Sequence, residues 1–100
     1  ALPRVQVVRC EEGGVKQRVE ASSAEDGLDA GGYAVQHRQR SRAENLAAAV
    51  PLRENALVYS PQDERFVAEL MGRLPQKGVV SRASPGATPG VVTLYLCDAD

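Results

Sequence analysis

The sequence predicts a small α+β domain, in which two helices pack on one face of a mixed sheet. Three observations support this fold class. Short apolar runs of strand length occur at 5–10, 56–59 and 91–96, an amphipathic segment with helix-start signals occupies 61–74, and the length of 100 residues suits one domain. We therefore expect residues 1–100 to form a single domain, with elements in the order β-β-β-α-β-α-β-β.

The first third of the chain predicts an N-terminal hairpin over 5–21. Residues 5–10 are mostly apolar, and the adjacent Gly13 and Gly14 favour a turn because glycine accepts positive φ. Over 15–21 apolar and charged residues alternate, which is typical of a half-buried second strand. The stretch 22–32 is small, acidic and glycine-rich, and we interpret it as a mobile loop.

Residues 33–83 predict two strand-helix units. The first has a short strand at 33–37 and a helix from Ser41 to Val50, since Ser41 and Glu44 stand in the spacing of a capping box. The second has a strand at 56–59 and a helix that begins at Ser60 and Pro61. This helix ends before Pro75 and leads into a strand that begins at 79.

The last element is a predicted C-terminal strand at 91–97. It is nearly all apolar and contains β-branched and aromatic residues on both faces. That pattern is typical of a central strand covered on both sides.

Net charge and motifs exclude several classes of function. The formal net charge of −1 gives no overall field toward nucleic acid or an anionic membrane. No apolar run approaches the roughly 18 residues of a transmembrane helix, so we expect a soluble protein of unassigned compartment. With one histidine and two widely spaced cysteines, no metal set is expected. The phosphate-loop, dinucleotide and metalloprotease motifs are missing from the sequence, so we expect no cofactor.

Cys10 and Cys97 each end a predicted strand, one near each end of the sequence. If the two strands pair, the cysteines come within reach of a disulfide. The alternative is a pair of buried thiols that behave as small apolar side chains.

The candidate binding site is a basic run that leads into the predicted helix at 41–50. Arginine side chains beside free helix N–H groups suit phosphate or carboxylate. The alternative is a solvated loop whose charges pair with nearby acidic residues. The candidate residues are His37, Arg38, Arg40 and Arg42.

Two local resemblances to known families occur. The segment VYSPQDERFVAEL followed by KGV, within 55–80, resembles the opening strand and helix of a TIR-type domain. Only 20 residues follow Val80, which leaves no room for that family's catalytic glutamate region, so no site residue is carried over. The segment YAVQHRQRSRAENLAAAV, at 33–50, is similar to the first strand and helix of the SPOR module, which implies peptidoglycan binding. The short link at 51–55 lacks a strand that SPOR modules have.

The leading functional hypothesis is a non-catalytic module that binds a protein partner or assembles with copies of itself. One alternative is anion or nucleic-acid binding through the basic run at 37–42. Another is a SPOR-like peptidoglycan-binding module. The sequence does not settle whether the protein is an enzyme, although a Cys–His pair is the one catalytic arrangement that it leaves open.

Overall fold

A computed structural model describes residues 2–10, 14–40 and 55–97 of the chain. The described elements, in chain order, are β1 (Arg4–Cys10), α1 (Gly14–Ala30), β2 (Val35–Arg40), β3 (Ala56–Tyr59), the 3₁₀-helix η2 (Pro61–Phe66), α3 (Val67–Gly72), β4 (Val80–Ala83) and β5 (Val91–Leu96). The helix predicted over 41–50 lies outside the described residues.

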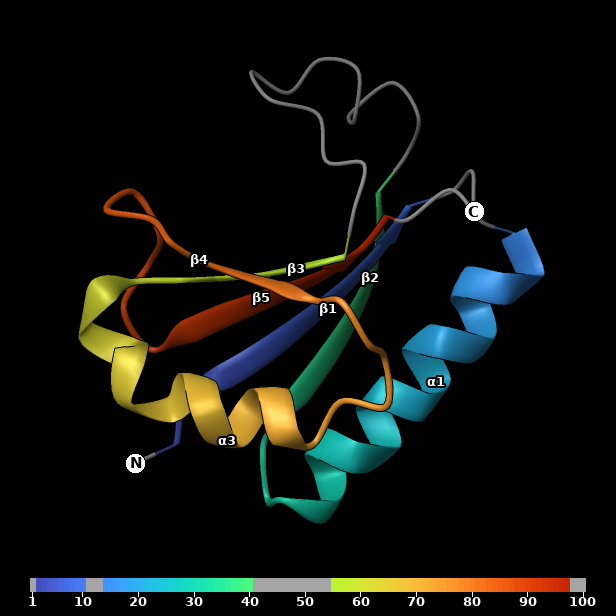
Figure 1. Cartoon of the computed structure of the whole chain (residues 1–100), viewed down its shortest axis with the longest axis horizontal. Coiled ribbons are helices and arrows are strands. Elements are labelled where there is room, and N and C mark those ends of the chain that lie inside the picture. The colour runs from blue at the N-terminus through green and yellow to red at the C-terminus, as the bar shows by residue number, and fades with distance from the viewer. Residues whose placement is uncertain (1, 11–13, 41–54, 98–100) are drawn as a thin grey trace.

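The strands form one five-stranded mixed sheet in the order β2-β1-β5-β3-β4 (Figure 1). β1 runs parallel to both of its neighbours, β2 and β5. β3 is parallel to β4 and antiparallel to β5. The prediction of an α+β domain with a mixed sheet is therefore confirmed.

Both α1 and α3 cover the same face of the sheet (Figure 1), as predicted. One apolar core joins the helices to the sheet, because alternate residues of the central strands point toward them. The helices contribute Ala21, Ala24, Leu28 and Leu70 to this core. Strands β1, β3 and β5 contribute Val5, Val7, Leu57, Tyr59, Val92, Leu94 and Leu96. We call this the helix side of the sheet.

The predicted hairpin over 5–21 and the predicted mobile loop over 22–32 are wrong. The first strand of that hairpin exists as β1, but residues 14–30, which include most of the predicted loop, form the 17-residue helix α1. Val15 and Val19, expected on the buried side of a strand, are 69% and 59% exposed. The buried stripe has helical spacing instead, at Ala21, Ala24 and Leu28. Two of those three residues are alanines, so the stripe is a weak apolar signal.

The glycines that suggested a loop allow a close approach between α1 and the segment after α3. A Cβ on Gly27 would lie 2.2 Å from the carbonyl oxygen of Arg73. A Cβ on Gly31 would lie 2.4 Å from Nε of the same arginine. Gly27 is thus a packing residue inside a helix, which is a role that local composition does not reveal.

The second helical segment begins as predicted. The Gln62 N–H donates to Ser60 Oγ at 3.4 Å, and Pro61 occupies the first position of η2. The segment starts as a 3₁₀-helix and continues as α3, which ends at Gly72. Asp63 of η2 is buried and accepts a 2.9 Å hydrogen bond from the Gly90 N–H. That bond fixes the loop that leads into β5.

β5 is the central strand, as predicted, but only its helix side is fully covered. Val92, Leu94 and Leu96 are buried, whereas the residues that alternate with them are half-buried. The described helices α1 and α3 both lie on the helix side of β5. Its second face is covered in part, since the residues there are half-buried. Among the described residues, no helix is long and apolar enough to cross a membrane.

Candidate functional site

The face of the sheet opposite the helices, which we call the open face, is the candidate functional surface. Register fixes its members, because residues paired across strands share a face. Its positions are Arg4, Gln6, Val8 and Cys10 of β1; Gln36, Arg38 and Arg40 of β2; Ala56 and Val58 of β3; Val80 and Arg82 of β4; and Val91, Thr93 and Tyr95 of β5.

Charge at the described strand positions of the open face is of one sign. The described arginine side chains are those of Arg4, Arg38 and Arg82, the backbone register adds position 40, and no strand position on the face carries Asp or Glu. The chain as a whole has 12 basic and 13 acidic residues, so charge is segregated rather than scarce. A surface of one sign produces a local potential even when the net charge is near zero.

The arginines surround a less polar centre. Arg38 and Arg82 are exposed and lie on β2 and β4, the two edge strands of the described sheet. Val58, Thr93 and Tyr95 lie between them on β3 and β5 and are half-buried. With strands about 4.8 Å apart, β2 and β4 are about 19 Å apart across the face.

The structure separates the predicted site residues. His37 points to the helix side, where its Nδ1 lies 3.1 Å from Oε1 of Glu25 on α1. Arg38 points to the open face, because neighbouring residues of a strand point to opposite sides. The backbone of Arg40 continues β2 on the Arg38 side. Arg42 lies outside the described residues, so the predicted contribution of a helix N-terminus there stays a prediction.

Sequence reasoning missed Arg4 and Arg82, as well as Gln6 and Gln36. The strand predicted at 33–37 ends before Arg38, whereas β2 extends to Arg40. Arg4 and Arg82 stand alone in the sequence and reach the same face only through strand order. Alternation within each strand is the available signal, and it becomes useful once the pairing is known.

Cys10 and Cys97 are joined by a disulfide, with their Cα atoms 4.9 Å apart. The pairing of Arg9 with Leu96 in the parallel β1–β5 ladder places the next two residues, the cysteines, side by side. Both sulfurs are therefore engaged, so neither is a thiolate that could pair with His37 for nucleophilic catalysis.

The main polar cluster of the helix side holds α1 and α3 together. The Tyr33 hydroxyl donates to Glu69, and the Arg73 Nε donates to the same carboxylate at 3.0 Å. Burial, followed by the hydrogen bond to Glu69 and its charge, raises the pKa of Tyr33 from 10.0 to about 12. The hydrogen bonds from Tyr33 and Arg73 lower the pKa of Glu69. A proton held this firmly serves packing rather than acid–base catalysis near neutral pH.

Metal-ligand geometry is not found in the described parts of the chain, where no three His, Cys, Asp or Glu side chains gather. Comparisons of the chain with family models, with curated proteins and with solved structures find no match.

Proposed function

We propose that this domain is a non-catalytic binding module whose open face docks a protein partner with an acidic surface. The observation that carries the proposal is the segregation of charge. Four arginine positions and no acidic position occupy that face of the described sheet. Opposite charges across an interface increase the association rate and exclude partners of the wrong sign.

The residue types of the open face favour a protein over a nucleic acid. Tyrosine and arginine are enriched at protein interfaces, where an apolar centre lies inside a polar rim. Sequence-tolerant binding of single strands needs several aromatic platforms. Tyr95 is the single aromatic side chain of the open face in the described strands.

A second copy of this chain is a poorer partner for this face. A two-fold dimer joins the same patch on both subunits. Two open faces would then bring arginines against arginines, and like charges placed opposite each other are destabilising. An acidic surface on a different protein avoids this cost.

The size of the face predicts a weak interaction. The face measures about 19 Å across and at most about 20 Å along the strands, and Val8, Cys10 and Ala56 on it are buried, so it offers less than about 400 Å² to a partner. This is below the roughly 800 Å² per partner of a standard stable interface, so we expect a transient, salt-sensitive complex. The disulfide favours a setting in an oxidising compartment, where such bonds persist.

The test uses a fluorescently labelled peptide of ten glutamates as a model acidic ligand, followed by anisotropy at about 50 and 200 mM NaCl. We expect saturable binding that weakens with salt, because the charges are exposed. The double variant Arg38→Glu and Arg82→Glu should weaken binding at least fivefold, since each exposed pair contributes up to about 1 kcal/mol. The double variant Lys16→Glu and Arg18→Glu, which reverses two exposed basic residues of α1, is the matched control and should have a smaller effect.

Three outcomes decide between the alternatives. Binding that is lost equally in the open-face and α1 variants would mean that net charge, not the open face, attracts the peptide. A labelled oligothymidylate that binds more tightly than the glutamate peptide would favour the nucleic-acid alternative. No binding of either probe at low salt would reject an electrostatic docking face. Thermal melting of each variant separates lost binding from lost folding.

A further inference from the structure

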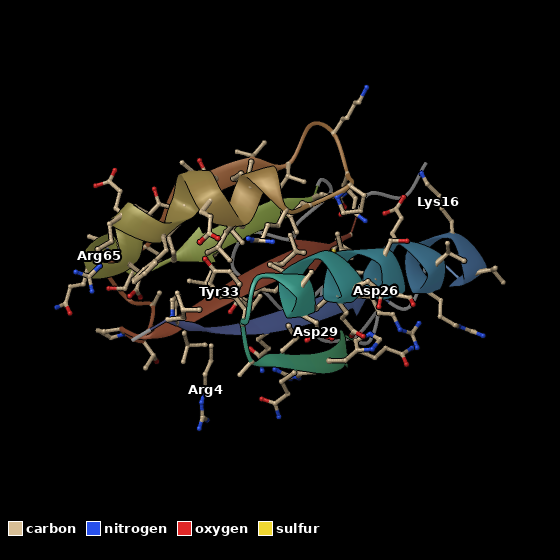
Figure 2. All side chains as sticks on the ribbon, turned by 90° about the horizontal axis from the view of Figure 1, so that it is seen from below. Arg4, Lys16, Asp26, Asp29, Tyr33 and Arg65 are labelled. Atoms are coloured by element: carbon tan, nitrogen blue, oxygen red, sulfur yellow. A yellow bond between two sulfur atoms is a disulfide. The ribbon has the colours of Figure 1, made fainter. Side chains whose placement is uncertain are left out.

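The open face contains a hollow at the amino ends of three parallel strands. Its volume is about 380 Å³, which lies at the small end of the 300–1,000 Å³ usual for ligand sites. Its lining comes from the start of β1, the segment that enters β2, and the start of β5: Arg4, Val5, Gln6, Ala34, Val35, Gln36 and Val91. Figure 2 shows the Arg4 side chain projecting outward from the start of β1.

Strand register brings the polar groups of this hollow together. Gln6 is paired with Gln36 across the β1–β2 ladder, so the two carboxamides start about 5 Å apart. Arg4 precedes Gln6 by two residues and therefore lies on the same face, about 7 Å away along the strand. Val91, the register partner of Arg4 on β5, supplies an apolar wall.

The charge of Arg4 has no acidic neighbour on this face of the described sheet. A guanidinium is a rigid fork of N–H donors that matches a carboxylate with two parallel hydrogen bonds. Each glutamine carboxamide can both donate and accept, which matches the N–H and C=O of a peptide group. The set therefore fits a carboxylate that lies next to an amide.

We propose that this hollow is a carboxylate-binding subsite, which receives one acidic group of the docked peptide or protein. Arg4 holds the carboxylate, Gln6 and Gln36 bind the adjoining amide, and Val91 and Ala34 contact its aliphatic carbons. This inference rests on the proposed function, because it assigns one anchor point within the open face. The carboxylate comes from an acidic side chain or from a chain terminus, which share this chemistry.

The experiment is a titration of isotope-labelled protein with three acetylated tripeptides, followed by NMR of the side-chain amides. The first peptide is acetylated and amidated with a central glutamate, the second is acetylated trialanine with a free carboxyl terminus, and the third is acetylated and amidated trialanine. We expect saturable shifts of the Gln6 and Gln36 amides with one of the first two peptides. The peptide that saturates at the lower concentration identifies the source of the carboxylate. Equal shifts with the neutral third peptide would overturn the proposal.

Variants test the assigned roles. Arg4→Gln should weaken carboxylate binding about tenfold, the usual worth of a charge-assisted hydrogen bond. Arg4→Lys should recover part of this loss, because the charge remains but the fork is lost. Arg18→Gln, on α1, is the matched control and should bind as the unaltered protein does. Carboxylate binding that persists unchanged in Arg4→Gln rejects the subsite.

The same variants separate failure of this subsite from failure of the docking face. If the ten-glutamate peptide binds and responds to Arg38→Glu with Arg82→Glu, while Arg4→Gln changes neither ligand, the face stands and the subsite is rejected. If Arg4→Gln weakens tripeptide binding but Arg38→Glu with Arg82→Glu leaves the affinity for the ten-glutamate peptide unchanged, the subsite is supported and the wider docking face is rejected. No carboxylate binding with either probe rejects both.

Discussion

Reducing the bond between Cys10 and Cys97 should remove a large part of the stability of this domain. The two cysteines are 87 residues apart in sequence, so the bond closes nearly the whole chain into one loop. In the chain-entropy treatment, a loop of this length lowers the entropy of the unfolded state by about 15 cal/mol/K. That corresponds to about 4.6 kcal/mol at 25 °C, against a usual total of about 5–15 kcal/mol.

The assay is urea unfolding, followed by circular dichroism, of the oxidised protein and of protein kept in reductant. We expect the free energy of unfolding to fall by about 4–5 kcal/mol, and the thermal midpoint to fall by about 20–35 °C. The denaturant slope should rise, because the reduced unfolded chain exposes more surface. The double variant Cys10→Ala and Cys97→Ala should have the same free energy of unfolding as the reduced protein, and adding reductant should not change it. A loss below about 1 kcal/mol would refute this reasoning, as would a mass that does not increase by two units on reduction.

Three further predictions concern contacts of the helix side. Gly27→Ala should destabilise the fold by about 1–3 kcal/mol in urea, because its Cβ would meet a backbone oxygen at 2.2 Å. Gly72→Ala, with nothing within 4 Å, is the control and should gain up to about 1 kcal/mol; a gain from both variants would contradict the close approach. Tyr33 should ionise near pH 12 by ultraviolet absorbance, and Glu69→Gln should lower its pKa. Because the unfolded phenol ionises near 10.0, the unfolded state loses this proton first, so the free energy of unfolding falls between pH 10.0 and about 12. A flat stability profile there would count against the buried phenol. Asp63→Ala should cost about 1–3 kcal/mol by removing the hydrogen bond that the buried carboxylate accepts from the Gly90 N–H, and unchanged stability would show that water replaces the carboxylate.

Local signals were sufficient for the second half of the chain. Ser60 and Pro61 mark a helix start by chemistry that acts within a few residues, and the structure has that start. The apolar runs at 56–59 and 91–96 are strands with those bounds. In these segments local preference and tertiary packing agree, which is why local reasoning worked.

The first third of the chain required information that is not local. Two glycines allow α1 to approach α3, and the partner of that contact, Arg73, is more than 40 residues away. Two of the three residues that α1 buries in the core are alanines. In the sequence, its apolar stripe is therefore hard to distinguish from the apolar–polar alternation of a strand. Tertiary contact therefore overrode a weak local preference.

Only part of the candidate site could be predicted from the sequence, because its residues come together through strand order as well as through local clustering. The arginines at 38 and 40 were visible as a cluster in sequence, but strand alternation removes His37 from them. Arg4 and Arg82 join them through a strand order that places β1 and β4 in the same sheet. No local pattern encodes that order.

The bond between the ends of β1 and β5 also decides how the domain carries mechanical load. Tension applied before Arg4 and after Cys97 passes along β1 and then directly across the two sulfur atoms. The helices and the other strands are bypassed, so the folded domain acts as a short rigid link that does not lengthen under force. Reduction would place the whole chain between the two cysteines, which are 87 positions apart, in the load path, and this adds about 300 Å of extendable chain. The oxidation state of one pair of side chains therefore sets whether this domain behaves as an inextensible connector or as a long elastic tether.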